Sequence, residues 1–355
     1  MRAKLFFAAK MAGTQAKVSL AILSAIALLC LIGPLVSSHP FDQVYRDYVL
    51  AGPSLVAHPT PYETNEALAA IARQMRAQIE SVQQYDGAVH VTFVSERPAD
   101  PRALRVFERS DVFGPVRAVE ARGGGSRLAV EAPLRRMVFL FGTDANGRDL
   151  LTRTLIAGRV SLAAGLLASL VALTIGVTYG AVAGYAGGRA DLFMMRIVEI
   201  IYALPFIFFV IVLVMMFGRR FALIFVAIGA VEWLDMARIV RGQALSIKRR
   251  DFVAAAEALG AAPAAILWRH IIPNASGPIL AFLAVIVPRV ILIESFISFL
   301  GLGVQEPLTS WGVLIADGAR NIQGSFHLLV FPALFLGATL GALQTLANAL
   351  AVKSQ

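Results

Sequence analysis

The sequence is short of the residues on which most catalytic and metal sites depend. Its one cysteine, Cys30, lies in an apolar run, so a disulfide within the chain and a cysteine-based metal site are excluded. The five histidines are scattered, and neither a His-Glu-x-x-His motif nor a Gly-x-x-x-x-Gly-Lys-Ser/Thr loop occurs. We therefore expect no resident metal, no cofactor in this chain and no enzymatic activity.

Charge is also scarce. Only 15% of the 355 residues are charged, 57% are hydrophobic, and the mean hydropathy is +0.70. Soluble domains rarely have this composition, which predicts an integral membrane protein. In such a protein the net charge of +9 indicates basic cytoplasmic loops, and we expect no nucleic-acid partner.

The N-terminal third has two parts of different character. Residues 1–17 carry four basic and no acidic side chains, and an apolar run follows over 18–36. The run is long and lacks a clean small-residue cleavage site, which favours a retained first membrane helix with a cytoplasmic N-terminus over a signal peptide. Residues 37–136 are polar and rich in proline, and we interpret them as a small α+β periplasmic insert. Its predicted elements are a helix over 64–84, strands over 88–94, 106–112, 115–121 and 127–131, and a glycine turn at 123–125.

The remainder, 141–355, is predicted to be a helical core with five membrane helices. These are expected at 160–185, 192–217, 221–240, 279–302 and 328–352. Glycines recur every fourth residue at Gly176, Gly180 and Gly184, a spacing that permits close helix packing in lipid. Six arginine and lysine residues lie in or just before the loop 241–278, so the positive-inside rule predicts that this loop is cytoplasmic. Counting spans from there puts the insert outside and both termini inside, although two arginines at 219–220 then fall in an outside turn.

A water-compatible stretch from Asp251 to Pro278 interrupts these apolar segments. Its alanines predict a helix over 252–259, which Gly260 ends because glycine tolerates a positive φ. Pro263 suits the first turn of a second helix over 264–272, which we expect to end before Pro273. The prediction is a pair of short helices joined by a glycine elbow.

This stretch resembles the coupling loop of bacterial binding-protein-dependent ABC transporter permeases. The family pattern is Glu-Ala-Ala, three residues, Gly, nine residues and Ile-x-Leu-Pro; the matching positions here are Ala255, Ala256, Gly260, Ile272 and Pro273. Ala254 stands where the family has Glu, and His270 where it has Ile. The resemblance implies that the helix pair docks into a groove on an ATPase subunit. It implies coupling roles for Phe252, Ala255, Ala256, Glu257, Gly260, Ala261, Arg269, His270 and Pro273.

A second motif precedes the core, at Gly142-Thr143-Asp144 and Gly147-Arg148-Asp149. Two carboxylates five residues apart are a weak indication of metal or acid–base chemistry. The stretch closely resembles the signature at the entry to the core of dipeptide, oligopeptide and nickel permeases. We interpret Thr143, Asp144, Gly147, Arg148 and Asp149 as a hydrogen-bonded loop at the outer membrane face and a candidate contact for a binding protein.

Charged groups inside membrane spans need a reason because they are costly there. Glu294, with Arg289 drawn towards it and Ser298 beside it, is a candidate lining of a translocation path; a structural contact between helices is the alternative. Arg196 and Glu199 are expected to form an exposed ion pair. The stretch Ser310-Trp311-Gly312 resembles an outer loop of the same family, which implies that Trp311 anchors the chain at the membrane interface.

Together, these resemblances imply an all-α permease subunit of an ATP-driven importer in the bacterial inner membrane, carrying peptides or a related small solute. The implied partners are a second homologous permease, two ATPase subunits that bind the ATP, a periplasmic solute-binding protein and the lipid bilayer. Two alternatives remain: a standalone channel or secondary transporter, and a membrane enzyme that uses the 143–149 loop and Glu294.

Overall fold

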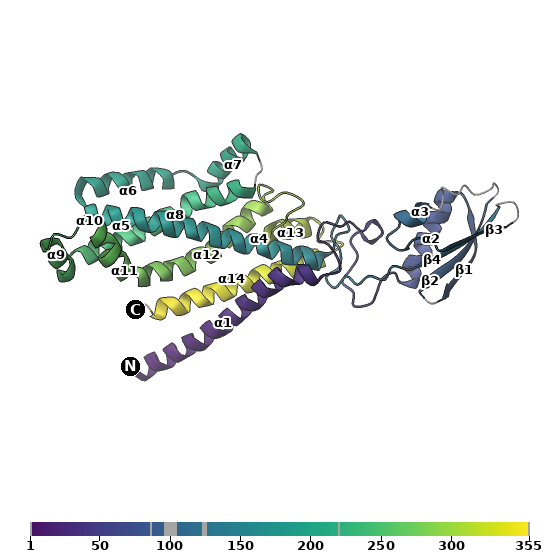
Figure 1. Cartoon of the computed structure of the whole chain (residues 1–355), viewed down its shortest axis with the longest axis horizontal. Coiled ribbons are helices and arrows are strands. Elements are labelled where there is room, and N and C mark those ends of the chain that lie inside the picture. Colours follow the sequence, from purple (N-terminus) through teal and green to yellow (C-terminus); the bar gives the residue numbers. More distant parts are fainter. Residues whose placement is uncertain (1, 86, 96–104, 123–125, 219–220, 354–355) are drawn as a thin grey trace. The chain divides into compact units, whose positions relative to one another are not determined.

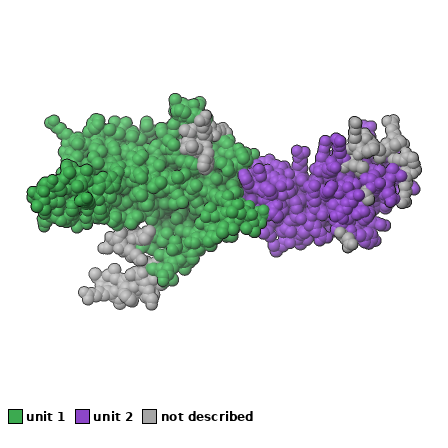
Figure 2. All heavy atoms as spheres, viewed as in Figure 1, with its two compact units in different colours: residues 1–37, 154–320, 329–355 green, residues 38–153, 321–328 purple. Residues whose placement is uncertain are grey.

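The structure is a computed structural model that describes residues 2–85, 87–95, 105–122, 126–218 and 221–353 (Figure 1). It contains two compact units (Figure 2). The helical unit comprises 1–37, 154–320 and 329–355, and the sheet unit comprises 38–153 and 321–328. The loop at 141–153, which we assigned to the core, therefore belongs to the same unit as the insert.

The sheet unit contains an antiparallel sheet whose described strands have the order β1-β2-β4-β3. The strands are β1 (Gln78–Tyr85), β2 (Ala88–Val94), β3 (Ala118–Arg122) and β4 (Arg127–Pro133). Register pairs Val91 with Val130 and Phe93 with Leu128, and these alternate side chains are buried on one face. Helix α2 (Pro61–Met75) contributes buried Leu68 to the same core. A short helical turn, η1 (Arg46–Tyr48), also belongs to this unit.

Two predicted elements of the insert are wrong. The helix predicted over 64–84 ends at Met75, because Arg76 adopts a left-handed conformation (φ 52°) that caps α2. The chain beyond it pairs with β2 as strand β1. The strand predicted over 106–112 is instead the short helix α3 (Arg105–Arg109), whose Phe107 is fully buried in the core. The strands at 88–94 and 127–131 are confirmed, and β3 begins three residues later than predicted. The glycines at 123–125 and the arginines at 219–220 lie outside the described residues.

The helical unit is formed by long apolar helices with short connecting ones. Its elements are α1 (Arg2–Val36), α4 (Leu150–Val171, whose first residues belong to the sheet unit), the π-helix η4 (Ala172–Gly176), α5 (Val177–Ala186), α6 (Gly188–Tyr202), α7 (Phe206–Phe217), α8 (Phe221–Lys248), α9 (Asp251–Ala258), α10 (Pro263–Ile266), the π-helix η5 (Leu267–Ile271), α11 (Ile272–Asn274), α12 (Ser276–Phe299), α13 (Trp311–Arg320) and α14 (His327–Lys353). Among the described residues, four helices are long and apolar enough to cross a membrane, or five if α6 and α7 form one broken span.

The predicted single span over 192–217 is wrong in detail. The chain breaks at 203–205 and bends by 76° between α6 and α7. Pro205 explains the break, because it has no backbone N–H and its ring disfavours a helical residue before it. The count of six spans therefore stays a prediction.

Helix α8 packs against α5, α12, α7 and α6. The glycine repeat of η4 and α5 makes the first of these contacts possible: an added Cβ at Gly180 would collide with the carbonyl oxygen of Ala237. At Gly176 and Gly184 it would lie 2.7 Å from a carbonyl oxygen of α8. The predicted close packing is confirmed, since only glycine lets the two backbones approach so closely.

Proline in α1 creates a second specific contact. Pro34 has no N–H, which leaves the carbonyl of Cys30 without its partner inside the helix. The guanidinium of Arg159 on α4 supplies the missing donors, with Nε 2.7 Å from the Cys30 carbonyl and Nη2 2.6 Å from that of Leu31. Helices α1 and α4 are thereby joined by charge-assisted hydrogen bonds.

Candidate functional site

The stretch that resembles a coupling loop, residues 251–274, is called the coupling segment below. It follows α8 as a helix, an elbow and a second helix. Helix α9 ends next to Gly260, which has a φ of +79°. Pro263 occupies the first turn of α10. Three apolar side chains anchor the segment in the core of the helical unit: Val253, Ile266 and Ile271 are buried to within 1% exposure. The predicted helix–glycine–helix arrangement is confirmed.

The end of the second helix is not where we predicted it. The chain stays helical through Pro273 and continues after a turn at Ala275 into α12. The π-helix η5 explains this continuity: the Ile272 N–H donates to the carbonyl of Leu267, five residues back. Such a bulge widens the helix just before the proline, where the ring would otherwise clash. The second half of the coupling segment therefore leads into α12 with only the turn at Ala275 between them.

Some side chains of the coupling segment contact the rest of the helical unit, and others are exposed to solvent. Glu257 accepts a hydrogen bond from the hydroxyl of Tyr185 at 3.1 Å, and the rings of Phe252 and His270 lie 6.3 Å apart. Ala256 and Ala261 pack against the core. The exposed residues of α9 are Asp251, Phe252, Ala254, Ala255, Glu257 and Ala258, and Leu259, Arg269 and Pro273 are among those exposed beyond it. The outer face of α9 is therefore a small, mostly apolar surface open to a partner.

The 143–149 loop lies in the sheet unit and is organised by Asp144. Its carboxylate accepts hydrogen bonds from the Arg148 Nε (2.8 Å) and from the backbone N–H groups of Asn146 (2.8 Å) and Arg148 (2.9 Å). The fully buried Arg153 places its Nε 3.2 Å from the same carboxylate. Gly147 has a φ of +77° and lies against the Tyr45 carbonyl, where no Cβ fits. Asp144 thus stabilises the turn through contacts within the loop.

The other polar residues of this loop are engaged as well. Thr143 donates to the carbonyl of Tyr48 and accepts from the N–H of Ala51 at 2.9 Å. Asp149 precedes α4 and accepts from the N–H of Thr152 at 2.7 Å, as an N-cap. Burial, with a smaller contribution from the charge of Asp144, raises the pKa of Asp149. Among the described residues no group of three or more ligand-type side chains has metal-binding geometry.

Glu294 is completely buried in the helical unit. Its Oε2 accepts from Ser161 on α4 at 3.0 Å, and its Oε1 accepts from Ser298 at 2.7 Å. Ser161 in turn accepts from the N–H of Trp311 at 3.3 Å. The carboxylate therefore connects α4, α12 and the start of α13, which favours the structural alternative for Glu294 and Ser298.

Arg289 does not approach Glu294, contrary to the prediction. Its Nη1 donates to Asp235 at 2.8 Å, and its Nε lies 3.6 Å from Glu232, both on α8. Sequence reasoning paired two charges on the same helix, whereas the nearest carboxylates come from the neighbouring one. Arg289 is 45% exposed.

Trp311 is not an interfacial anchor. It is completely buried, and its Nε1 donates to the carbonyl of Thr154 at 3.0 Å. Its indole also fills space beside Gly158, where an added Cβ would lie 2.8 Å from the ring. The expected exposed ion pair of Arg196 and Glu199 is confirmed, at 2.8 Å.

Comparison with known proteins identifies the family. The family described as "Binding-protein-dependent transport system inner membrane component" matches residues 176–352. The oligopeptide transport system permease protein OppC of Haemophilus influenzae is 51% identical over 209 residues, which are 59% of this chain and 67% of that protein. The chain belongs to the family of binding-protein-dependent transport permeases. This family consists of transporter subunits of the inner membrane, not of enzymes.

Other relatives agree with this assignment. The permease is 56% identical to OppC of Escherichia coli K12 over 200 residues, 56% of this chain and 66% of that protein. It is 46% identical to the dipeptide transport system permease protein DppC of Bacillus subtilis over 211 residues, 59% of this chain and 66% of that protein. The matched region thus covers about two thirds of each relative, 66–67%.

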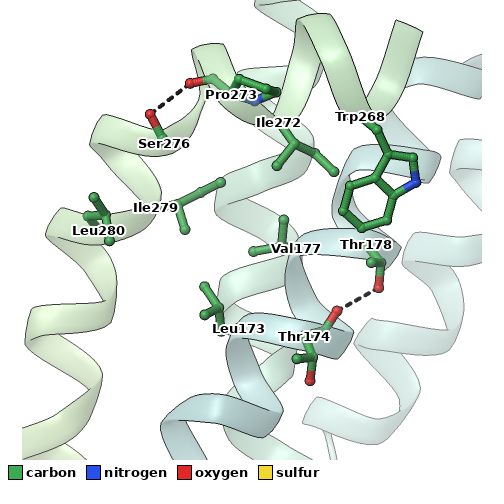
Figure 3. A pocket seen from close by; sticks show the side chains of 10 residues that line it. All are labelled: Leu173, Thr174, Val177, Thr178, Trp268, Ile272, Pro273, Ser276, Ile279 and Leu280. Carbon is green, nitrogen blue, oxygen red and sulfur yellow. Dashed lines mark hydrogen bonds between the residues drawn. The ribbon is translucent and has the colours of Figure 1, made fainter. Parts of the chain in front are cut away.

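An apolar cleft of about 390 Å³ lies beside the coupling segment of the permease (Figure 3). Trp268, Ile272 and Pro273 face Leu173, Val177 and their neighbours on η4 and α5 across it. The hydroxyls of Thr174, Thr178 and Ser276 also line it, but each donates to a backbone carbonyl three or four residues earlier in the chain. The cleft therefore offers a polar solute no unoccupied hydrogen-bond donor from these hydroxyls.

Sequence reasoning missed two long-range ion pairs of the permease. Arg241 on α8 makes a bidentate contact with Asp191 on α6, at 2.5 and 2.6 Å. Arg241 was counted only as a cytoplasmic charge, and Asp191 was not singled out. Glu232 and Asp235 were likewise not connected with Arg289. An acidic residue within an apolar segment was the available signal, since such a group needs a partner at membrane depth.

Proposed function

We propose that this permease is the membrane subunit of an ATP-driven importer for peptides, forming half of the translocation path. The observation that carries the proposal is the exposed α9 surface, held by a glycine elbow between two membrane helices. The relatives' names supply the solute class, since they are oligopeptide and dipeptide transport permeases.

The permease binds no ATP itself; two cytoplasmic ATPase subunits bind it and move when it is hydrolysed. Helix α9 lies in a groove on one of them, as a helix-in-groove contact. Because the second half of the segment leads into α12 through a single turn, movement of α9 is transmitted to α12. The permease and a second, homologous one then alternate between inward-open and outward-open states.

The topology follows from charge. Basic residues around the coupling segment place it in the cytoplasm, together with both termini, and the sheet unit lies in the periplasm. Figure 1 supports this arrangement: the first turns of α1 and the last turns of α14 lie towards the same end of the helical unit as α9. The six-span count includes α8, which carries several charges that pair within the unit.

The sheet unit and its 143–149 loop form a docking surface for the periplasmic solute-binding protein. The support is their position in the chain and the well-ordered hydrogen bonding around Asp144. Deletion of residues 53–125 is expected to weaken binding-protein affinity and uptake; unchanged values of both would contradict this role.

A pull-down of the tagged permease from gently solubilised membranes tests the proposed function. We expect a second permease, ATPase subunits and a solute-binding protein whose bound peptide can be released and weighed. A permease that transports alone would instead support a channel or secondary transporter.

A further inference from the structure

Four charged side chains form a cluster between α8 and α12: Glu232, Asp235, Arg238 and Arg289. We propose that Asp235 and Arg289, which pair with each other at 2.8 Å, bind the two charged ends of a zwitterionic peptide as it crosses the membrane. Arg289 takes the terminal carboxylate and Asp235 takes the terminal ammonium group. The proposal rests on the proposed function, and it adds the chemical groups that recognise the solute.

In the proposed topology, with α8 and α12 as membrane helices, the cluster lies at membrane depth. Glu232 and Asp235 are near the middle of α8 (Phe221–Lys248), and Arg289 is near the middle of α12 (Ser276–Phe299). Charged groups at this depth are expensive unless they face one another or water. Arg289 and Asp235 nevertheless keep 45% and 20% of their side-chain surface exposed in this chain. An exposed guanidinium cannot face acyl chains at low cost, so this surface faces a water-filled path or the second permease.

The geometry leaves recognition groups unused. Among the described residues, Arg289 donates one hydrogen bond, from Nη1 to Asp235 at 2.8 Å. A guanidinium has five donors and binds a carboxylate with two parallel hydrogen bonds. Glu232 lies behind it, only 3% exposed, with Oε1 3.6 Å from the Arg289 Nε. The Oε2 of Glu232 has no hydrogen-bond partner in the described part of the chain. Glu232 therefore holds the guanidinium electrostatically and leaves its outer donors available.

The backbone is irregular on two sides of the cluster. Tyr202 is the last residue of α6, directly before the 76° break, and Arg238 lies 4.1 Å over its ring. On α12, Pro288 precedes Arg289 and leaves the carbonyl of Ala284 without its helical donor. Broken helices near the bilayer midplane are where secondary transporters place solute sites. The same physical reason applies here, because irregular backbone at this depth must be buried in protein or line a water-filled cavity.

The charges also match the solute. Two carboxylates and two guanidinium groups sum to zero, so the cluster does not accumulate ions of one sign. A zwitterion can replace the pairing of Arg289 with Asp235 by one contact at each of its ends, so that neither side chain is left without an opposite charge. A peptide with one blocked terminus restores only one of the two contacts.

The test combines two peptide modifications with two substitutions. The complete importer, reconstituted in proteoliposomes with saturating peptide-loaded binding protein, carries Arg289→Gln or Asp235→Asn. Uptake of a free, a C-terminally amidated and an N-terminally acetylated peptide is measured, and each rate is divided by the wild-type rate for the same peptide. This ratio removes the preference of the binding protein itself. Arg196→Gln on α6, an exposed arginine paired with Glu199, is the matched control.

We expect Arg289→Gln to lower uptake of the free peptide by about tenfold to a hundredfold, the usual effect of losing a charge-assisted hydrogen-bonded contact. It should leave uptake of the amidated peptide within about twofold of wild type. Asp235→Asn should show the corresponding pattern: uptake of the free peptide is lowered to the same degree, and uptake of the acetylated peptide stays close to wild type. Arg289→Lys keeps the positive charge, so it should lower uptake of the free peptide less than Arg289→Gln does and should likewise spare the amidated peptide. Arg196→Gln should leave the uptake of all three peptides unchanged.

An equal loss for free and blocked peptides would overturn the proposal and assign the cluster to helix packing or to a contact with the second permease. Unchanged uptake of all peptides would overturn it as well. Co-purification of the ATPase subunits in wild-type amounts shows that each variant assembles. If the wild-type importer moves none of the peptides, the proposed function fails, and this proposal fails with it.

Discussion

Gly260 gives the sharpest test of how the coupling segment works. Its φ of +79° lies in the left-handed region, and within the described part of the chain no atom beyond its two neighbours lies within 4 Å of the position that a Cβ would occupy. The effect of Gly260→Ala is therefore backbone strain without a steric clash. That strain is about 1–2 kcal/mol for a residue with a Cβ, which lowers the ratio of formed to unformed elbow about 5–30-fold.

Gly260→Pro is more severe for two reasons. The proline ring fixes φ near about −65°, so the native elbow cannot form. The substitution also removes the N–H that donates to the Glu257 carbonyl at 3.0 Å. We expect Gly260→Ala to reduce peptide uptake partly and Gly260→Pro to abolish it, with membrane insertion intact in both.

The assay is ATP-dependent uptake, with ATP hydrolysis and membrane content measured in parallel. Gly277→Ala is the matched control, because Gly277 lies in a helix, has no positive φ and is also open within 4 Å. It should retain wild-type uptake. Wild-type uptake by Gly260→Pro would refute the assignment of this segment to coupling.

Three further predictions concern packing and electrostatics. Gly180→Leu should separate α5 from α8, because even a Cβ collides with the Ala237 carbonyl; a clear loss of thermal stability in detergent checks this, and an unchanged melting temperature would contradict it. Asp144→Asn should destabilise the sheet unit by about 3–5 kcal/mol, since it removes the carboxylate charge beside the buried guanidinium groups of Arg148 and Arg153; chemical unfolding measures it, and a loss below about 1 kcal/mol would be too small for a buried ion pair. Burial alone would raise the pKa of Glu63, but hydrogen bonds from Thr60 and His58 outweigh it and lower that pKa. The ionised Glu63 therefore stabilises α2 fully above the ordinary glutamate pKa, and this stabilisation is lost as the pH falls through the lowered pKa. In the wild type, α2 should become less resistant to pepsin as the pH is lowered. In Glu63→Gln, the resistance of α2 to pepsin should depend less on pH.

Local constraints explain what the sequence could predict. Gly260 and Pro263 restrict the backbone by themselves, so the elbow and the start of the second helix were predictable from residue type. The glycine repeat at Gly176, Gly180 and Gly184 likewise encodes a close helix contact without any knowledge of the partner. In both cases a single residue type excludes the alternatives.

Long-range contacts explain what it could not. The partner of Arg289 depends on how α8 lies against α12, which no local pattern specifies. In the insert, short apolar patterns fit a helix or a strand equally well. Residues Gln78–Tyr85 form a strand because they pair with β2, a contact that the local sequence does not specify. The interfacial position predicted for Trp311 came from the resemblance of its loop to the family's outer loop, whereas Gly158 on α4 leaves the space in which its indole is buried.

The central claim is that the exposed end of α9 contacts an ATPase subunit, and photo-crosslinking tests it most directly. Cys30, the one native cysteine, is 1% exposed, so a benzophenone maleimide will label Leu259→Cys selectively. Leu259 is 88% exposed at the end of α9, and Leu55→Cys in the sheet unit, 86% exposed, is the control. We predict a crosslinked product of the permease and one ATPase subunit from residue 259 and none from residue 55. An assembled importer that gives no such product from residue 259, or equal products from both positions, would contradict the account.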